Sequence, residues 1–518
     1  MQEIKRLDSG KPRKQVFILG AGIAGLVAAY ELTRLGHSCE VIEASTRPGG
    51  RIFTHRFSSK QYGELGAMRI PASHDYTRHY ISELRLTLRP FIDNTTQGFY
   101  DLRNLVARQG MALEELVKAF MLTPQEQGVI REKGIGFILG SIVAEEIEKL
   151  SGAEKEDLFA GNITTQNLRY LDNTAVRSAL KQRWSHGAVS LAGSATTLES
   201  LWERPLAKYV RDAISENGLG LSEIVGGMDL LPMKLADELS AVVQYQTEVV
   251  AVQLRSNGRL KLVLRDDGRS CFEKTPHFVL CTIPFGVLRH LQLDGLSAAK
   301  MEAIRNTSYA SATKVLLHCS ARFWETQYKI VGGRSVSDGI SRQTYYPSDN
   351  APPPPGARLT SRELIDKSQP HMWGIHTAPE ILPKIIGAEA RDRSFLSKSA
   401  AEGPGVLLSS YSWGLDSQRL GGLSDSDRVE AAARSVSRFH PEVLDYIDSH
   451  ASKCWEQNRW SMGAYADTFP GDAGDYYHDG LMAEGNLFFA GEHLSPFHGW
   501  IQGGIYSSLR AVAEIAAA

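Results

Sequence analysis

Residues 15–51, QVFILGAGIAGLVAAYELTRLGHSCEVIEASTRPGGR, decide the fold of this 518-residue chain. A short apolar run leads into the glycine turn GAGIAG at 20–25, and helix-forming residues follow at 26–35. A second strand-like pattern at 39–42 then ends on Glu43. A strand, a glycine turn, a helix and a second strand in this order are typical of the βαβ unit that opens a dinucleotide-binding fold.

Each glycine of the GxGxxG spacing has a physical role. Gly20 permits the tight turn, Gly22 lets the backbone approach a pyrophosphate, and Gly25 lets the helix pack closely on the strand. The helix N-terminus offers unpaired N–H groups to phosphates. Glu43, 18 residues beyond Gly25, can accept hydrogen bonds from an adenosine ribose. The alternative is a structural βαβ unit without a ligand.

The next turn, RPGGR at 47–51, favours FAD over NAD. A cation beside a glycine pair can contact a pyrophosphate from the far side while the backbone passes close by. Gly50 and Arg51 are therefore predicted cofactor contacts. The pentapeptide alone would be a basic surface turn, but its position directly after Glu43 favours the cofactor.

The overall composition excludes several classes of protein. Hydrophobic residues make up 42% and charged residues 22%, and the net charge is -2, so nothing favours nucleic acid or an anionic membrane as a partner. Residues 1–14 lack the apolar core of a secretion signal, and no run of about 18 apolar residues predicts a membrane span. Five scattered cysteines without a CxxC pair predict reduced thiols, no metal site and a cytoplasmic location.

Strand and helix patterns alternate along the chain. Helix formers dominate from about 110 to 215. β-Branched residues alternate with polar ones in the strand-like segments that follow, at 242–255, 260–264, 278–282, 313–318 and 406–412. Four consecutive prolines at 352–355 cannot join a central strand. The stretch 349–404 is therefore predicted as a loop, which is a lid, an oligomer contact or a tolerated surface insertion.

The C-terminal segment returns to cofactor-like chemistry. The strand-like run LFFAGE at 487–492 ends on the acid Glu492. The pair Gly503-Gly504 then opens a helix with apolar residues at helical spacing. A carboxylate beside a helix N-terminus favours a second part of the same ligand, such as a flavin ribityl chain. The cofactor is therefore predicted to be bound by both ends of the chain.

These motifs together resemble the flavin-containing amine oxidase superfamily, and within it the L-amino-acid oxidases. The resemblance covers nearly the whole chain. It is carried by GAGIAG at 20–25, Glu43-Ala44, RPGGR at 47–51, GELGAMRIP at 63–71, EIVGGMDLLP at 223–232, Thr313-Lys314, FAGEH at 489–493 and HGWIQGG at 498–504. It implies FAD as cofactor and oxidation of a carbon that bears an amine, with oxygen as electron acceptor.

The motif GAMRIP indicates the subfamily. The resemblance places Arg69 beside the flavin, where its guanidinium would bind a substrate α-carboxylate through paired charge-assisted hydrogen bonds. Oxidases of plain amines have no carboxylate to hold. The alternative is a structural ion pair of Arg69. Tyr411 resembles the second carboxylate contact, through its hydroxyl, and would otherwise be a core aromatic.

The same resemblance implies the rest of the substrate cleft. Gly499 and Trp500 form one wall, with the Gly499 carbonyl near the substrate amine, and Tyr465 matches the opposite wall. Lys314 matches the lysine that holds a water molecule near the flavin. Ala464 stands where monoamine oxidases carry a flavin-linking cysteine, so FAD is predicted to be non-covalent.

Further residues are predicted to contact the cofactor by backbone or side-chain packing. They are Ile23, Ala24, Ala44, Gly66, Ala67, Met68, Arg69, Val249, Gly499, Trp500, Ile501, Gln502 and Gly504. One departure concerns the histidine that some relatives place before the GGMD element. Residues 209–213 read YVRDA and hold none, so the identity of any general base stays open.

The resulting prediction is an α/β protein with a discontinuous Rossmann-type FAD-binding domain, a mixed-sheet substrate-binding domain and a helical insertion domain. The predicted boundaries are 1–75, 220–295 and 450–518 for the FAD-binding domain, 76–110 and 296–449 for the substrate-binding domain, and 111–219 for the helical domain.

The predicted activity is that of an FAD-dependent L-amino-acid oxidase, which yields 2-oxo acid, ammonia and hydrogen peroxide. An amino-acid monooxygenase, an oxidase of amines without a carboxylate and a non-catalytic flavoprotein binding module are the alternatives. The predicted partners are an L-amino acid and oxygen, with a homodimer as the assembly and no nucleic acid or membrane.

Overall fold

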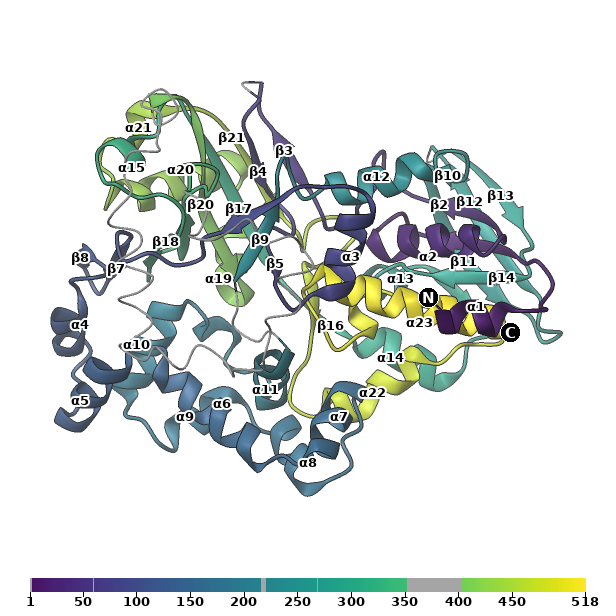
Figure 1. Cartoon of the computed structure of the whole chain (residues 1–518), viewed down its shortest axis with the longest axis horizontal. Coiled ribbons are helices and arrows are strands. Elements are labelled where there is room, and N and C mark those ends of the chain that lie inside the picture. Colours follow the sequence, from purple (N-terminus) through teal and green to yellow (C-terminus); the bar gives the residue numbers. More distant parts are fainter. Residues whose placement is uncertain (1, 59, 216–219, 268, 352–401) are drawn as a thin grey trace.

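A computed structural model of the chain describes residues 2–58, 60–215, 220–267, 269–351 and 402–518 (Figure 1). Most of the proline-containing stretch that the sequence predicts to be a loop lies outside the described residues.

A five-stranded parallel sheet is built around the motif at 15–51. Its strand order is β10 (Val243–Gln244), β2 (Ser38–Ile42), β1 (Gln15–Leu19), β14 (Phe278–Cys281) and β23 (Leu487–Phe489). Val16 to Leu19 of β1 are buried, as expected for a parallel strand covered on both faces. Helix α2 (Ile23–Arg34) connects β1 to β2. The predicted βαβ unit is therefore confirmed.

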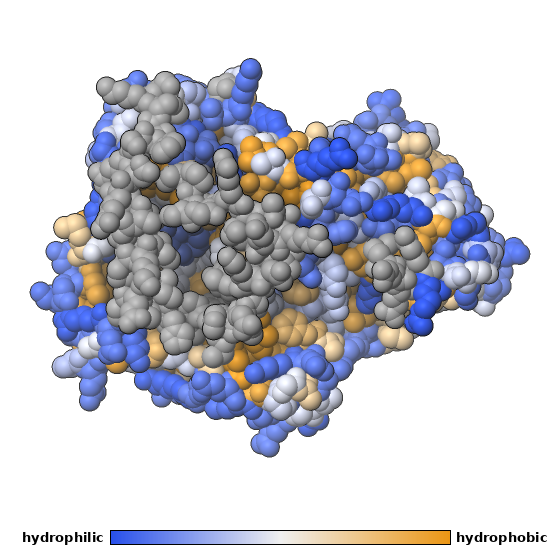
Figure 2. Space-filling view, in the orientation of Figure 1, coloured by the Kyte–Doolittle hydropathy of each residue, from blue (hydrophilic) through white to orange (hydrophobic). Residues whose placement is uncertain are grey.

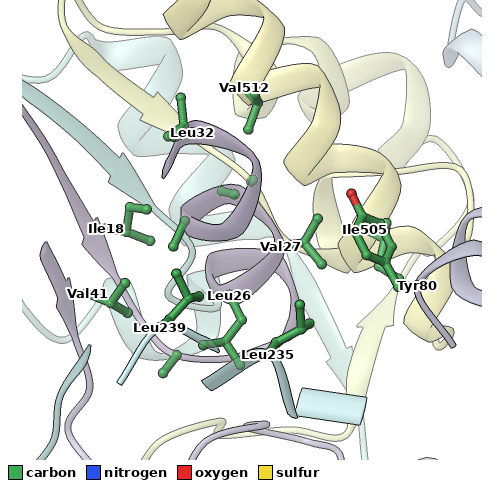
Figure 3. Packing of buried hydrophobic residues seen from close by; sticks show 14 of the residues in the cluster. Ile18, Leu26, Val27, Leu32, Val41, Tyr80, Leu235, Leu239, Ile505 and Val512 are labelled. Atoms are coloured by element: carbon green, nitrogen blue, oxygen red, sulfur yellow. The ribbon is translucent and has the colours of Figure 1, made fainter. Parts of the chain in front are cut away.

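The two ends of the chain pack together on this sheet. Helix α23 (Ile501–Ala517) lies beside α2, in yellow and purple in Figure 1, and the Ser508 hydroxyl donates to the Ala24 carbonyl at 2.8 Å. Figure 3 shows the apolar core between them, in which Val27 of α2 lies near Ile505 of α23. A Cβ at Gly504 would lie 2.7 Å from the Ile23 side chain, so glycine permits this close approach.

A mixed seven-stranded sheet forms the second large layer. Its order is β21 (Ile447–Cys454), β17 (Ala312–Cys319), β20 (Gly405–Trp413), β19 (Gln343–Tyr345), β18 (Arg334–Ser337), β7 (Phe99–Leu102) and β8 (Leu105–Arg108). The predicted strands at 313–318 and 406–412 pair antiparallel, and Lys314 lies opposite Tyr411 in the ladder. This register brings together two residues that are far apart in the sequence.

Smaller sheets complete the β structure. They are β13 (Ser270–Lys274), β12 (Leu260–Asp266), β11 (Thr247–Leu254) and β15 (Gln292–Asp294); β5 (Ile70–Pro71), β9 (Leu221–Ile224) and β6 (Leu88–Phe91); β3 (Thr54–Arg56) and β4 (Tyr62–Glu64); and β16 (Ser308–Ala310) and β22 (Tyr465–Asp467).

The predicted helical segment is a separate group of helices with its own apolar core, at the lower left of Figure 1. They are α4 (Leu113–Ala119), α5 (Pro124–Lys133), α6 (Phe137–Lys149), α7 (Gly152–Ala160), α8 (Gln166–Asn173), α9 (Val176–Lys181), α10 (His186–Thr196) and α11 (Leu206–Ser215). Thr123 and Ser151 cap α5 and α7, each in a reciprocal pair with the glutamate three residues later.

The other helices cover the sheets and connect them. They are α1 (Gln2–Asp8), α3 (Asp75–Glu83), α12 (Leu230–Glu238), α13 (Phe285–Leu288), α14 (Ala298–Asn306), α15 (Phe323–Thr326), α19 (Gly414–Gly421), α20 (Asp425–Ser437), α21 (Val443–Tyr446) and α22 (Asp472–Leu481). The α/β class with mixed sheets is confirmed, and the exact domain boundaries stay a prediction.

On the face that Figure 2 shows, hydrophilic residues cover most of the two ends of the molecule and hydrophobic residues gather nearer the middle. Within the described ranges, no helix combines the length and the apolar character that a bilayer span requires. All five cysteines are free thiols.

Candidate active site

One large cavity joins the parallel sheet, the mixed sheet and the helical group. Its volume is about 2190 Å³, which exceeds the roughly 300–1,000 Å³ of an ordinary ligand pocket. Its lining includes most of the predicted site residues: Gly20, Gly22, Ile23, Ala24, Glu43, Ala44, Gly50, Arg51, Gly66, Ala67, Met68, Arg69, Val249, Lys314, Tyr411, Tyr465, Glu492, Gly499, Trp500, Ile501 and Gly504. The space is sufficient for a large cofactor and a second molecule.

The first glycine turn has the geometry that the spacing predicts. Gly20 has a φ of +107°, which favours glycine. A Cβ at Gly25 would lie 2.0 Å from the Gly20 carbonyl oxygen, so Gly25 permits close packing and does not itself line the cavity. A Cβ at Gly22 would meet nothing within 4 Å, since this residue faces open space. The backbone at Gly22 is therefore accessible to a pyrophosphate.

The second glycine turn lies against the first. Gly49 forms a parallel bridge with Gly22, and its N–H donates to the Ala21 carbonyl at 2.8 Å. Glu43 is fixed between the turns, because its carboxylate accepts from the Ala21 N–H at 2.7 Å and from the Ser45 N–H at 2.8 Å. This arrangement holds a carboxylate at the cavity wall beside two glycine backbones.

Arg51 and Glu492 connect the two ends of the chain. The guanidinium of Arg51 donates to the Glu492 carboxylate at 2.6 Å and to the Ala464 carbonyl at 3.3 Å. Glu492 also accepts from the N–H groups of Gly499 at 3.0 Å and Ala466 at 2.9 Å. Burial opposes ionisation of Glu492, but Arg51 and these N–H groups outweigh burial and lower the pKa of its carboxyl.

The residues around the two turns fit FAD. Accessible backbone at Gly22, the N-terminus of α2 and a fixed carboxylate at Glu43 suit the adenosine and pyrophosphate parts of the cofactor. Glu492 and the start of α23 lie on the same cavity wall and suit a more distant part of the same molecule.

Arg69 lines the cavity and also forms an ion pair. Its guanidinium bonds the Asp93 carboxylate and donates to the Tyr345 hydroxyl at 3.1 Å. A second guanidinium, that of Arg334, lies 3.6 Å from Asp93. Burial opposes the charge of Arg69, but Asp93 outweighs burial and raises the pKa of Arg69 above its ordinary value. The group Arg69, Asp93 and Arg334 has a net positive charge that faces the cavity.

Lys314 of β17 lies directly opposite Tyr411 of β20 in the mixed sheet. Its ammonium nitrogen donates to the Gly66 carbonyl at 2.7 Å and to the Glu64 carbonyl at 3.2 Å, and it lies 4.4 Å from the centre of the Tyr411 ring. Burial lowers the pKa of Lys314, and the nearby Glu64 carboxylate only partly opposes this effect. Lys314 is thus a buried amine held by backbone carbonyls at the cavity wall.

Three residues that the resemblance places in the walls of a substrate cleft line this cavity. Gly499 has a φ of +82°, and a Cβ there would lie 3.5 Å from the Tyr465 ring. Trp500 directly precedes α23 and makes an edge contact with His74, with 5.0 Å between the ring centres. Tyr465, Gly499 and Trp500 therefore border the same part of the cavity.

Gln502 differs from its predicted place. Its side chain is buried, accepts from the Thr77 N–H and hydroxyl at 3.0 Å each, and donates to Asp75 at 2.7 Å. It does not line the cavity. The reason is that residue 502 lies on the side of α23 that packs against α3, so it supports the start of the helix.

Several cavity residues were missed by the sequence analysis. Asp93 and Arg334 line the cavity near Arg69, and Lys208 and Asp212 of α11 line the helical wall. Tyr345 lies outside the lining and accepts a hydrogen bond from Arg69. None of them belongs to a motif with a recognisable spacing. The YVRDA segment at 209–213 was considered in the sequence analysis only for its missing histidine. Tyr209 of this segment also lines the cavity. Within the described ranges, no group of three or more His, Cys, Asp or Glu side chains is placed to hold a metal ion.

Comparison with known proteins identifies the family. Residues 23–516 match the model of the flavin containing amine oxidoreductases. The chain belongs to this family. An L-tryptophan oxidase, RebO, from Lentzea aerocolonigenes is 33% identical, with 97% of this chain and 98% of that protein covered. An L-amino-acid oxidase from Siganus canaliculatus is 28% identical, with 99% of this chain and 88% of that protein covered.

Solved structures of this family share the fold. Putrescine oxidase bound to putrescine superimposes with a TM-score of 0.67 at 17% identity, covering 98% of this chain and all of that one. Cyclohexylamine oxidase from Brevibacterium oxydans also gives 0.67, at 16% identity, covering 98% of this chain and 99% of that one. The predictions of a flavin-containing amine oxidase, of FAD as its cofactor and of a flavin-dependent oxidoreductase are confirmed.

Proposed function

We propose that this flavin-containing amine oxidase is an L-amino-acid oxidase, which converts an L-amino acid, oxygen and water to a 2-oxo acid, ammonia and hydrogen peroxide. The observation that carries the proposal is a guanidinium, that of Arg69, in the lining of the same cavity as the two glycine turns. The names of the relatives, L-tryptophan oxidase and L-amino-acid oxidase, support the same activity.

Arg69 and Tyr411 bind the substrate carboxylate in this proposal. A hydrogen bond to a charged group contributes about 1.5–3 kcal/mol, and a guanidinium can form two in parallel. In the free enzyme Asp93 neutralises Arg69, which therefore has a partner before the substrate arrives. Because Arg334 also lies near Asp93, the aspartate keeps a counterion when the substrate takes its place on Arg69.

The aromatic walls favour the neutral form of the substrate amine. Tyr465 and Trp500 exclude water from the part of the cavity next to Gly499, which favours the neutral amine with its free lone pair. The Gly499 carbonyl accepts a hydrogen bond from one N–H group of the substrate amine. When bound, FAD would supply the two-electron oxidation of the substrate, with oxygen as the final electron acceptor. The main contribution of the protein is orientation, which supplies about 7–11 kcal/mol in well-ordered sites.

The remaining roles belong to the same proposal. Lys314 holds a water molecule near the cofactor, and the side chain of Ala464 offers no sulfur for a covalent link, so FAD is non-covalent. The parallel sheet with α2 and α23 is the FAD-binding domain, the mixed sheet is the substrate-binding domain, and α4–α11 are the helical domain. A homodimer and a cytoplasmic location remain predictions.

An anaerobic titration tests the function. The holoenzyme is mixed with each of the twenty L-amino acids and with tryptamine, which lacks the carboxylate, and flavin absorbance is followed. We expect L-amino acids to bleach the flavin and tryptamine to leave it oxidised, with 2-oxo acid and peroxide as aerobic products. Bleaching by tryptamine alone would indicate an amine oxidase, an amide product would indicate a monooxygenase, and no bleaching would indicate a binding module.

A further inference from the structure

Helix α11 has one face in the core of the helical group and another on the cavity. The buried face repeats at helical spacing and consists of Leu206, Val210 and Ala213. The cavity face consists of Lys208, Tyr209 and Asp212. In Figure 1, α11 lies on the side of the helical group that faces the rest of the molecule. Two opposite charges are thus presented to the cavity from one helix.

These two charges form an ion pair. The Lys208 ammonium nitrogen lies 3.2 Å from a carboxylate oxygen of Asp212, one helical turn further along. Only 12% of the Lys208 side chain and 26% of the Asp212 side chain are exposed. The order of the charges is the weaker one for a helix, because an acid placed before a lysine at this spacing stabilises a helix better than the reverse. The pair therefore adds little to helix stability, and its more distinctive feature is its position in the cavity lining.

The ion pair lies close to the walls of the proposed substrate site. Asp467, two residues after Tyr465 in β22, is ion-paired with Arg204 and does not line the cavity. The charge of Lys208 acts on His498, the neighbour of Gly499, and contributes with burial and Arg211 to the lowered pKa of this histidine. The hydroxyl of Tyr209 on α11 donates to the Leu201 carbonyl at 3.3 Å, and Tyr411 and Tyr465 pack against the cluster that contains Leu201, so α11 adjoins these walls.

Apolar residues line the space in front of the pair. Leu198, Leu201 and Trp413 belong to the cavity lining, and Tyr411 and Tyr465 pack against the same cluster. A substrate that is held by its carboxylate at Arg69 and by its amine at Gly499 would direct a large side chain along these residues. The side chain would then end near Lys208 and Asp212.

We propose that the Lys208–Asp212 ion pair is a specificity element that selects L-amino acids with large uncharged side chains. This inference rests on the proposed oxidase function. A neutral side chain leaves the pair intact. A lysine or glutamate side chain would have to compete with one member of the pair, and the displaced member would be left as an uncompensated charge in a largely buried site.

Reciprocal substitutions test the inference on the holoenzyme. Lys208→Met frees Asp212, so kcat/KM for L-lysine relative to L-tryptophan should rise by about 10- to 100-fold. Asp212→Asn frees Lys208 and should raise the relative value for L-glutamate, by less, because Asp467 still opposes the charge of Lys208. The double variant restores an uncharged wall and should return to the preference of the unmodified enzyme.

A matched control is available on α6. Glu145 and Lys149 also form an acid–lysine pair one turn apart, at 2.8 Å, in the opposite order and more exposed, and neither residue lines the cavity. Lys149→Met should leave the ratios unchanged. Parallel losses for all substrates in the Lys208 and Asp212 variants would overturn the inference, as would an unmodified enzyme that oxidises L-lysine as well as L-tryptophan. An enzyme that oxidises no L-amino acid would overturn the proposed function itself.

Discussion

The two ends of the cavity are built in different ways. At the FAD end, the glycine turns at 20–25 and 47–51 and the carboxylate of Glu43 come from one continuous segment and are joined by backbone hydrogen bonds. At the proposed substrate end, Arg69, Tyr411 and the cavity face of α11 come from distant segments. The FAD end depends on backbone conformation and close packing. The other end depends on the charges and hydrogen-bonding groups of individual side chains.

The largest effect is expected at Gly25, at the FAD end of the cavity. Gly25→Ala places a Cβ 2.0 Å from the Gly20 carbonyl, so either β1 or α2 must shift. We expect purified protein without flavin absorbance and with a clearly lower Tm. Gly128→Ala in α5 is the control, because a Cβ there meets nothing within 4 Å, and it should retain FAD. A yellow, fully loaded Gly25→Ala protein would contradict the assigned role of this glycine.

Arg69 gives the next largest effect, at the substrate end. Arg69→Gln removes two charge-assisted hydrogen bonds, so kcat/KM for L-amino acids should fall by about 10² to 10⁴, mainly through KM, with FAD retained. Steady-state peroxide assays measure this change. Any residual oxidation of tryptamine should stay as it was, since it has no carboxylate to lose. An unchanged KM for L-amino acids would remove the carboxylate assignment.

Lys314 lies between the two ends, and its effect depends on pH. Because its pKa is lowered, the ammonium form is lost as pH rises through a value below the ordinary lysine pKa of about 10.4. If the ammonium holds the water near FAD, flavin reoxidation by oxygen should slow as pH rises through that value. Lys314→Met should be slower by about 100-fold and independent of pH over the same range. Stopped-flow reoxidation with a wild-type pH profile in the variant would contradict the assignment.

Gln502 should give the smallest effect, although it belongs to a cofactor motif. Gln502→Ala removes the hydrogen bonds to Thr77 and Asp75, which costs about 1–3 kcal/mol of stability and lowers Tm by a few degrees. Since the side chain does not line the cavity, kcat and KM should not change. A loss of FAD affinity without a change in Tm would show that the residue contacts the cofactor after all.

Local motifs predict the cofactor end well. The tight turn at Gly20 and the close packing at Gly25 follow from the spacing of glycines, because few backbones satisfy both requirements at once. The strands at 313–318 and 406–412 also follow from their residue pattern. Arg69, Tyr465 and Trp500 required the resemblance to a family, since no local pattern distinguishes them from core or surface residues.

The sequence by itself determined the βαβ unit, because its strand, turn and helix are close along the chain, and it indicated the family and the cofactor through short motifs that can each be recognised locally. Only the tertiary structure decided which charges meet. Asp93 neutralises Arg69, the packing of α11 brings the Lys208–Asp212 pair to the cavity, and Gln502 turns away from the cavity. The energy of a buried charge depends on its neighbours in space, and sheet register and helix packing set those neighbours.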